Sequence, residues 1–329
     1  MNRVEKREDF NLKAREGVEA IEASAFEHIG ADVLESEHIS RPTTSYWKDA
    51  MGRLFKNKAA VVCRVILGII FVGAVIVPMI SPFTISEQSV LDANQTFMFK
   101  NTKTGKAHIF GTDTLGRDIF VRIWHGARTS LFIAFAAVFV NLMIGLIYGG
   151  ISGYIGGWVD NLMMRIIEII NGIPYLMIVI LLMMVLEPGI GTIIVAYAAV
   201  GWTGMARLVR GQVMGLKEQE YVIAARTMGA SPMRIICRHL IPNTLSVVIV
   251  NITLAIPAVI FTEAFLSFIG LGVPIPNASW GTLANEGIRV FQQYPYQLIL
   301  PAIFISVTML SFNLLGDALR DAFDPKLRR

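Results

Sequence analysis

Six long apolar runs decide what this 329-residue chain can fold into. A membrane-spanning helix needs about 20 mostly apolar residues. The runs that approach or reach this length are 59–80, 131–148, 166–186, 190–205, 245–268 and 298–315, and the fourth would borrow 201–206 to complete its crossing. The composition agrees, because 54% of residues are hydrophobic and only 16% are charged, against roughly 25% charged in soluble domains. The sequence therefore predicts an all-α polytopic membrane protein with six transmembrane helices, and it excludes a soluble enzyme.

The distribution of Lys and Arg predicts the orientation, because basic residues concentrate in cytoplasmic loops. Bases cluster in 48–58, 206–240 and 319–329, whereas the connection between the fifth and sixth runs carries only Arg289. The loop 81–130 departs from this pattern, because it is expected outside the cytoplasm and yet contains six basic residues. We expect both termini in the cytoplasm. The expected organisation is a cytoplasmic N-terminal segment with a juxtamembrane anchor (1–58), a first transmembrane helix (59–80), an extracytoplasmic loop (81–130), a five-helix core (131–318) and a cytoplasmic tail (319–329).

Residues 111–130 read GTDTLGRDIFVRIWHGARTS. Apolar residues recur there at helical spacing opposite charged ones, which is typical of a short helix lying in the membrane interface. The five histidines are scattered without HExxH or comparable spacing, so the sequence offers no catalytic residue and no metal site. Glycines crowd the end of the second run and predict close helix approach there; they are Gly145, Gly149, Gly150, Gly153, Gly156 and Gly157.

The segment 206–240 is the largest expected cytoplasmic loop of the core. Glu220 to Met228 can form a short helix, which Gly229 would end because glycine adopts the left-handed conformation without a steric penalty. Ser231-Pro232 would start a second helix, with the proline at its first position. Small residues at the tip would let a groove of another protein approach closely. The alternative is an ordinary loop that holds two spans at the right distance.

The stretch EYVIAARTMGASPMRIICRHLIPN (220–243) resembles the coupling loop of binding-protein-dependent ABC importer permeases. Their motif is Glu-Ala-Ala, three residues, Gly, nine residues, then Ile-x-Leu-Pro. Ala224, Ala225, Gly229 and Pro242 fall at the required positions. The chain departs from the motif at three positions, which are Ile223 for Glu, His239 for Ile and Ile241 for Leu.

The first departure removes the acidic residue of the motif. Glu220, one helical turn earlier, or Arg226 would be the polar contact that replaces it, and the sequence does not choose between them.

Three further segments, 111–131, 263–272 and 280–287, are similar to the C-type permease subunit of oligopeptide and dipeptide importers, and 39–58 is similar to its pre-membrane stretch in Gram-positive bacteria. The resemblance implies the type I importer permease fold in a bacterial cell membrane. It also implies a homologous second permease, two ATP-binding subunits docked on the cytoplasmic loops and an extracytoplasmic peptide-binding protein, with no nucleic acid. This chain would be non-catalytic and bind no cofactor, with ATP and Mg2+ on the partners. The sequence has no GxxxxGK[ST] phosphate loop.

Polar residues inside the runs are candidates for the translocation pathway or for helix packing, because intramembrane polar groups are costly. They are Glu168, Asn171, Asn251 and Glu263. Arg165 and Glu168 could pair at i,i+3, and the Asn171-Gly172 and Pro174 positions should bend the third run.

Other functions remain open on the sequence. The scaffold also suits an importer of nickel or another small solute. A secondary transporter or channel would show inverted repeats and intramembrane charge chains, and a membrane hydrolase would show a catalytic constellation; the sequence shows neither pattern.

Overall fold

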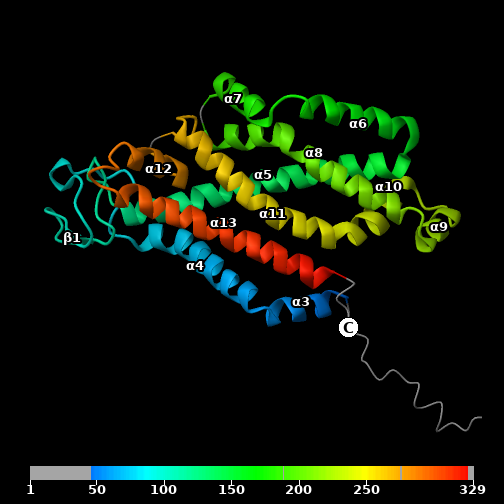
Figure 1. Ribbon diagram of the computed structural model, residues 1–329, viewed down its shortest axis with the longest axis horizontal. Coiled ribbons are helices and arrows are strands. Elements are labelled where there is room, and N and C mark those ends of the chain that lie inside the picture. Colours follow the sequence, from blue (N-terminus) through cyan, green and yellow to red (C-terminus); the bar gives the residue numbers. More distant parts are fainter. Residues whose placement is uncertain (1–45, 188, 275, 325–329) are drawn as a thin grey trace, which may run out of the picture. The chain divides into compact units, whose positions relative to one another are not determined.

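The computed structural model describes residues 46–187, 189–274 and 276–324, and the described residues from Trp47 onward form one compact unit. Most of the expected N-terminal segment and the end of the expected tail lie outside the described residues. The longest helices are α4 (Lys58–Ile80), α5 (Ile119–Ile155), α8 (Ile190–Leu216), α11 (Ile241–Phe268) and α13 (Tyr296–Phe323) (Figure 1). The shorter elements are α3 (Tyr46–Lys56), η3 (Val90–Asp92), α6 (Gly157–Asn171), α7 (Tyr175–Val185), α9 (Glu220–Thr227), α10 (Pro232–Ile235), the π-helical turn η4 (Ile236–Leu240), α12 (Trp280–Ile288) and the hairpin strands β1 (Phe99–Lys100) and β2 (Ala107–His108).

Five helices of the described chain are long and apolar enough to cross a membrane, and α6 with α7 would make a sixth. The fourth expected run is one helix, α8, which continues to Leu216. The fifth is longer than expected, because α10 and η4 lead without a break into α11 and the helical stretch spans Pro232–Phe268. The predicted polytopic helical fold is therefore confirmed, with one broken span.

The break lies where the sequence predicts a bend. α6 ends at Asn171, α7 begins at Tyr175, and the two axes differ by 75°. Pro174 lies just before α7, and its ring disfavours a helical conformation for the residue before it. The predicted bend in the run 166–186 is thus confirmed, and it is sharp enough to divide the run between two helices.

The separate interfacial helix expected within 111–130 is also wrong. α5 begins at Ile119 and runs through the second apolar run without interruption. The Asp118 carboxylate caps it by accepting a hydrogen bond from the Val121 N–H at 2.7 Å. The apolar residues at helical spacing are the first turns of a spanning helix: Ile119 and Ile123 pack against Ala278 and Leu283 instead of lipid headgroups.

The glycine cluster allows a close helix approach, as the sequence predicts, and the structure shows that the neighbouring helix is α8. A Cβ added at Gly153 would lie 2.8 Å from the Arg210 carbonyl oxygen, and one at Gly149 would meet the Ala206 carbonyl. Any larger residue would force these backbones apart. Gly156 and Gly157, at φ +71° and +58°, form the turn between α5 and α6.

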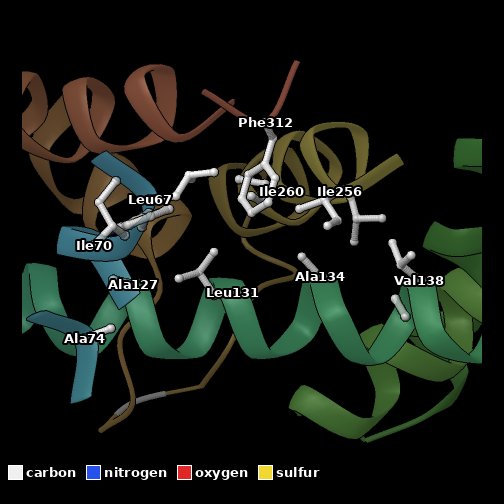
Figure 2. Packing of buried hydrophobic residues seen from close by; sticks show 13 residues of the cluster. Leu67, Ile70, Ala74, Ala127, Leu131, Ala134, Val138, Ile256, Ile260 and Phe312 are labelled. Carbon is white, nitrogen blue, oxygen red and sulfur yellow. The ribbon is translucent and has the colours of Figure 1, made fainter. Parts of the chain in front are cut away.

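The main hydrophobic core lies where α4, α5, α11 and α13 meet (Figure 2). Small residues of α5, such as Ala127 and Ala134, let the larger side chains of the other three helices pack closely. These include Leu67, Ile70, Ile256, Ile260 and Phe312. A second core lies where α8, α9, η4 and α11 meet.

Candidate functional site

The predicted coupling loop forms a helix–turn–helix whose turn has a defined hydrogen-bond pattern. The Ala230 N–H donates to the Ala225 carbonyl and the Gly229 N–H donates to the Arg226 carbonyl, each at 3.0 Å. This pair of bonds is a Schellman motif, which requires a left-handed residue after the helix. Gly229 supplies it, with φ +82°. The predicted role of Gly229 in ending the helix is confirmed.

The second short helix also starts as predicted. Ser231 caps α10, because its hydroxyl accepts from the Arg234 N–H at 3.4 Å, and Pro232 occupies the first turn. The loop itself is shorter than 206–240, because α8 extends to Leu216. The loop outside α8 therefore consists of residues 217–231 and α10, which include α9 and the turn at Gly229.

One face of this helix–turn–helix is anchored to the helical core. Val222 of α9 and Ile235 of α10 are both 0% exposed and pack with Val213 of α8. The opposite surface is exposed and unusually apolar for a loop. Met228 is 87% exposed and Met233 60%, and they are accompanied by exposed Tyr221 and Ile223. A rigidly anchored element with exposed large apolar residues has the character of a protein-docking surface.

The structure places the two candidate substitutes for the missing acidic residue differently. Glu220 is exposed in the first turn of α9. The Arg226 guanidinium lies over the Tyr154 ring of α5 at 5.4 Å from its centroid. Ala224 is exposed, Ala225 is half-buried and Pro242 is exposed at the start of α11.

Of the four intramembrane candidates, two lie at the surface of α6. Glu168 pairs with Arg165 at 2.7 Å, and both side chains are exposed, so the predicted i,i+3 pair is present. Asn171, the last residue of α6, accepts a hydrogen bond from the Thr203 hydroxyl of α8 at 3.0 Å. The contacts of these two residues are those of surface pairing and helix packing.

Asn251 and Glu263, both on α11, have opposite environments. Asn251 is exposed and lines a cavity of about 300 Å³ between α8, α11 and α13. Glu263 is 1% exposed and accepts hydrogen bonds from Ser130 at 2.9 Å and Ser267 at 2.8 Å. Glu263 therefore joins α5 to α11 inside the protein, whereas Asn251 faces open space.

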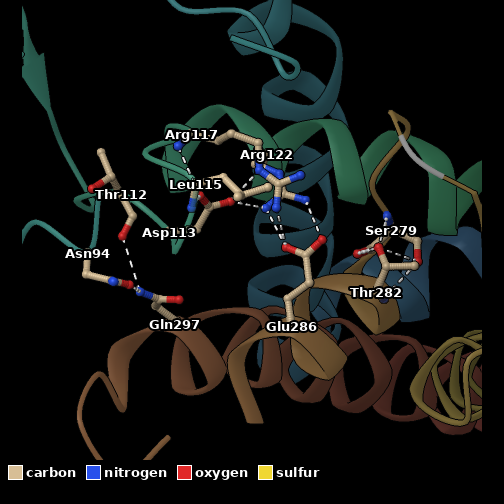
Figure 3. A network of polar contacts seen from close by, with 10 residues as sticks. All are labelled: Asn94, Thr112, Asp113, Leu115, Arg117, Arg122, Ser279, Thr282, Glu286 and Gln297. Atoms are coloured by element: carbon tan, nitrogen blue, oxygen red, sulfur yellow. Dashed lines mark hydrogen bonds and ion pairs between the residues drawn. The ribbon is translucent and has the colours of Figure 1, made fainter. Parts of the chain in front are cut away.

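A charge cluster at the other end of the bundle from α9 is the feature that the sequence reasoning missed (Figure 3). Arg122, 2% exposed, donates to the Asp113 carboxylate and to Glu286 at 2.6 and 3.1 Å. Arg117, 3% exposed, donates to Asp113 at 2.6 Å and to Glu286 at 2.9 Å. These four residues, the charge cluster, tie the start of α5 to α12. The sequence placed Arg117, Asp118 and Arg122 opposite the apolar residues of an interfacial helix, but in the structure all three are buried.

The charge cluster lowers the pKa of the Glu286 carboxyl. Burial by itself would raise the pKa of this carboxyl, but hydrogen bonds and charge from Arg122 and Arg117 hold it below its usual range. No sequence periodicity could reveal the cluster, because Glu286 lies 164 residues from Arg122.

A second buried polar chain lies beside it. The His108 Nδ1 is 2.7 Å from the Asp118 carboxylate, and the ring stacks on Phe83 with centroids 4.1 Å apart. Burial raises the pKa of Asp118, against the lowering effect of the Val121 N–H and His108. This contact gives His108 a carboxylate partner that the spacing of the histidines in the sequence does not indicate. Across the described residues, no three His, Cys, Asp or Glu side chains are placed to hold a metal ion.

Comparison with known proteins identifies the class to which this helical bundle and its anchored loop belong. Residues 141–329 match the family model described as binding-protein-dependent transport system inner membrane component. The chain belongs to this family, and it is a multi-pass membrane protein of the ABC importer permease kind. Residues 45–96 match a second model, the N-terminal TM domain of oligopeptide transport permease C.

Two relatives and one solved structure illustrate what the chain is similar to. The chain is 51% identical over 296 residues to the dipeptide transport system permease protein DppC of Bacillus subtilis, covering 90% of each chain. It is 48% identical to the oligopeptide transport system permease protein OppC of the same organism, covering 94% of this chain and 99% of the relative. A solved structure described as the inward-facing MetNI methionine ABC transporter matches with 19% identity and a TM-score of 0.45, over 61% of this chain and 96% of that one.

Proposed function

We propose that this chain is one of two permease subunits of an ATP-driven importer of dipeptides or oligopeptides. Substrate would cross between this chain and a homologous permease, delivered by an extracytoplasmic peptide-binding protein and driven by two ATP-binding subunits. The full-length similarity to two permeases named for dipeptide and oligopeptide transport supports the substrate class.

In this proposal, the anchored helix–turn–helix receives the movement of the ATP-binding subunits and transmits it to the spanning helices. Its inner face is fixed to α8 and η4 by Val222 and Ile235, so a force on its outer face would reach the spanning helices. Its outer face presents the apolar side chains that a groove on an ATP-binding subunit would cover. The hydrolysis of ATP takes place on the partners, and this chain transmits the movement.

We propose that both termini lie in the cytoplasm, with α9 on the cytoplasmic side and the 81–118 region outside. The excess of Lys and Arg around α9 supports this orientation. Reporters fused after Gly215 and Arg329 should read as cytoplasmic, and reporters fused after Asn94 and Gln293 as extracytoplasmic. A cytoplasmic signal at Asn94 would contradict the orientation.

The docking role is tested by substitutions in the turn and on α9. Gly229→Asp places a Cβ at φ +82°, and Ala225→Asp puts a carboxylate into the proposed interface, where its desolvation without a partner costs several kcal/mol. Both variants should abolish peptide uptake and recovery of the ATP-binding subunits in pull-downs, while the chain remains inserted. Ile223→Glu is the informative control on the same surface, because it restores the acidic residue of the family motif and should retain uptake.

The outcome separates docking from substrate class. Normal uptake and full recovery of the ATP-binding subunits in both aspartate variants would mean that this loop is not the docking site. Uptake of nickel but not of labelled dipeptides by the unmodified complex would leave the importer class standing and replace the peptide substrate.

A further inference from the structure

An ion pair between a buried carboxylate and a partly exposed guanidinium joins α6 to α8 close to the coupling loop, and a serine of α5 contacts the same carboxylate. Asp160, in the first turn of α6, is 5% exposed. One carboxylate oxygen accepts from the Arg210 Nε at 2.5 Å, and the other accepts from the Arg210 Nη2 at 2.6 Å. The Ser152 hydroxyl of α5 donates to the same carboxylate at 2.5 Å. Two parallel bonds between a planar guanidinium and a carboxylate fix both distance and angle.

The position of α6 depends on few contacts with α8. Asp160 and Ile167 are the two buried residues of α6, and with Asn171 they lie on one face at i, i+7 and i+11. This face meets α8 at three levels: Arg210 contacts Asp160, Ala206 and Trp202 pack with Ile167, and Thr203 bonds Asn171. The remaining side chains of α6 are exposed or partly exposed. Within the described chain, the pair with Arg210 is the one ionic contact that holds α6 to α8.

The same part of α8 leads directly into the coupling loop. From Arg210 the helix continues to Leu216, and Val213 packs against Val222 of α9. Lys217, just beyond the helix, donates to the Gly153 carbonyl of α5 at 2.9 Å. A displacement of α9 would therefore move the end of α8, and Arg210 with it.

We propose that Asp160 is a positioning residue that fastens α6 to α8, so that movement of the coupling loop carries the broken α6–α7 pair along with α8. This inference rests on the proposed function, because it assigns Asp160 a part in transmitting the movement that ATP-binding subunits would impose. The geometry explains why the fastening is ionic and bidentate: a neutral or single contact would let α6 slide or rotate against α8. The glycines of α5 bring its end close enough for Ser152 to complete the site.

The test compares uptake with ATP hydrolysis in the complete importer, reconstituted in proteoliposomes. Asp160→Asn keeps the shape of the side chain but removes its charge. We expect radiolabelled dialanine taken up per ATP hydrolysed to fall about tenfold, the size of a typical coupling between sites, while ATP hydrolysis itself changes less. Asp160→Glu restores the charge and should recover most of the ratio. A purely structural role would lower uptake and hydrolysis together, through loss of protein.

Glu168→Gln is the matched control on the same helix. It also removes one carboxylate from an Arg pair, but that pair is exposed, with side-chain exposures of 77% for Arg165 and 59% for Glu168. Exposed pairs contribute little, so uptake per ATP should equal that of the unmodified complex. An equal loss in Glu168→Gln and Asp160→Asn would overturn the assignment to Asp160.

The distance between α6 and α8 can be measured directly with spin labels, without a transported substrate. Spin labels at Trp158→Cys on α6 and Met214→Cys on α8 would be placed in a Cys237→Ser background, because Cys237 is exposed. When Asp160 is present, the distribution of distances between the two labels should not change on adding ATP. In the Asp160→Asn variant this distribution should shift or broaden. An unmodified complex that neither hydrolyses ATP nor takes up peptide would refute the proposed function. If the unmodified complex works and Asp160→Asn has the same uptake per ATP and the same distance between labels, the proposed role of Asp160 would be refuted while the proposed function would stand.

Discussion

Truncation of Arg122 should destabilise the protein at the end opposite the coupling loop. Arg122→Ala removes three donated bonds, one to Asp113 and two to Glu286. Asp113 would be left with Arg117 as its remaining cationic partner in the charge cluster. Breaking a buried pair by removing one partner costs about 3–5 kcal/mol. The Glu286 side chain is 30% exposed and can be hydrated, so the lower end of about 3 kcal/mol applies.

The assay is thermal unfolding of the purified complex, followed by tryptophan fluorescence. At about 2–4 °C per kcal/mol, Arg122→Ala should lower the midpoint by roughly 6–12 °C. Arg122→Lys keeps the charge but loses the forked geometry, so it should cost about 1.5 kcal/mol, the value of one charge-assisted hydrogen bond.

Arg289→Ala is the matched control, because this arginine follows α12 only three residues after Glu286 and is exposed. Exposed substitutions of this kind change stability by about 0.5 kcal/mol or less. An Arg122→Ala midpoint within the range of Arg289→Ala would show that the charge cluster does not stabilise the fold, and the argument from buried charge would be wrong.

Three further predictions concern other parts of the molecule. Because the folded-state pKa of Glu286 is lowered, its contribution to stability should be present above the ordinary glutamate pKa of about 4.3 and lost as the pH falls through the lowered folded-state pKa. Glu286→Gln should flatten this acidic part of the curve of unfolding midpoint against pH, and an unchanged curve would contradict the prediction. Gly149→Val should separate α5 from α8 at the Ala206 carbonyl and lower the midpoint by the equivalent of about 1–3 kcal/mol of overpacking; a wild-type midpoint would refute the close approach. Glu263→Leu should leave buried hydroxyls unsatisfied and lower the stability by about 1–3 kcal/mol. Glu263→Gln should retain uptake. Loss of uptake at normal stability in Glu263→Gln would instead indicate a pathway role.

Local sequence signals predicted the parts of the site that depend on neighbouring residues. The turn after α9 follows from Gly229, because only a residue that tolerates positive φ closes a Schellman motif without strain. Ser231-Pro232 marks the next helix start for an equally local reason, since a cap and a missing N–H act within one turn. The glycines of α5 predicted close packing, although not that α8 is the helix they approach.

The sequence by itself determined the membrane class, because long apolar runs have no other stable environment, and the spacing of its coupling-loop motif pointed to its family. Only the tertiary structure decided that residues 119–130 belong to a spanning helix and that Arg117 and Arg122 are buried. Their partner Glu286 lies on α12, and the partner of Asp160 lies on α8. Charges at helical spacing look the same in sequence whether they face water or a distant carboxylate. The physical reason is that burial of a charge is favourable only with a partner, and that partner is brought near by folding.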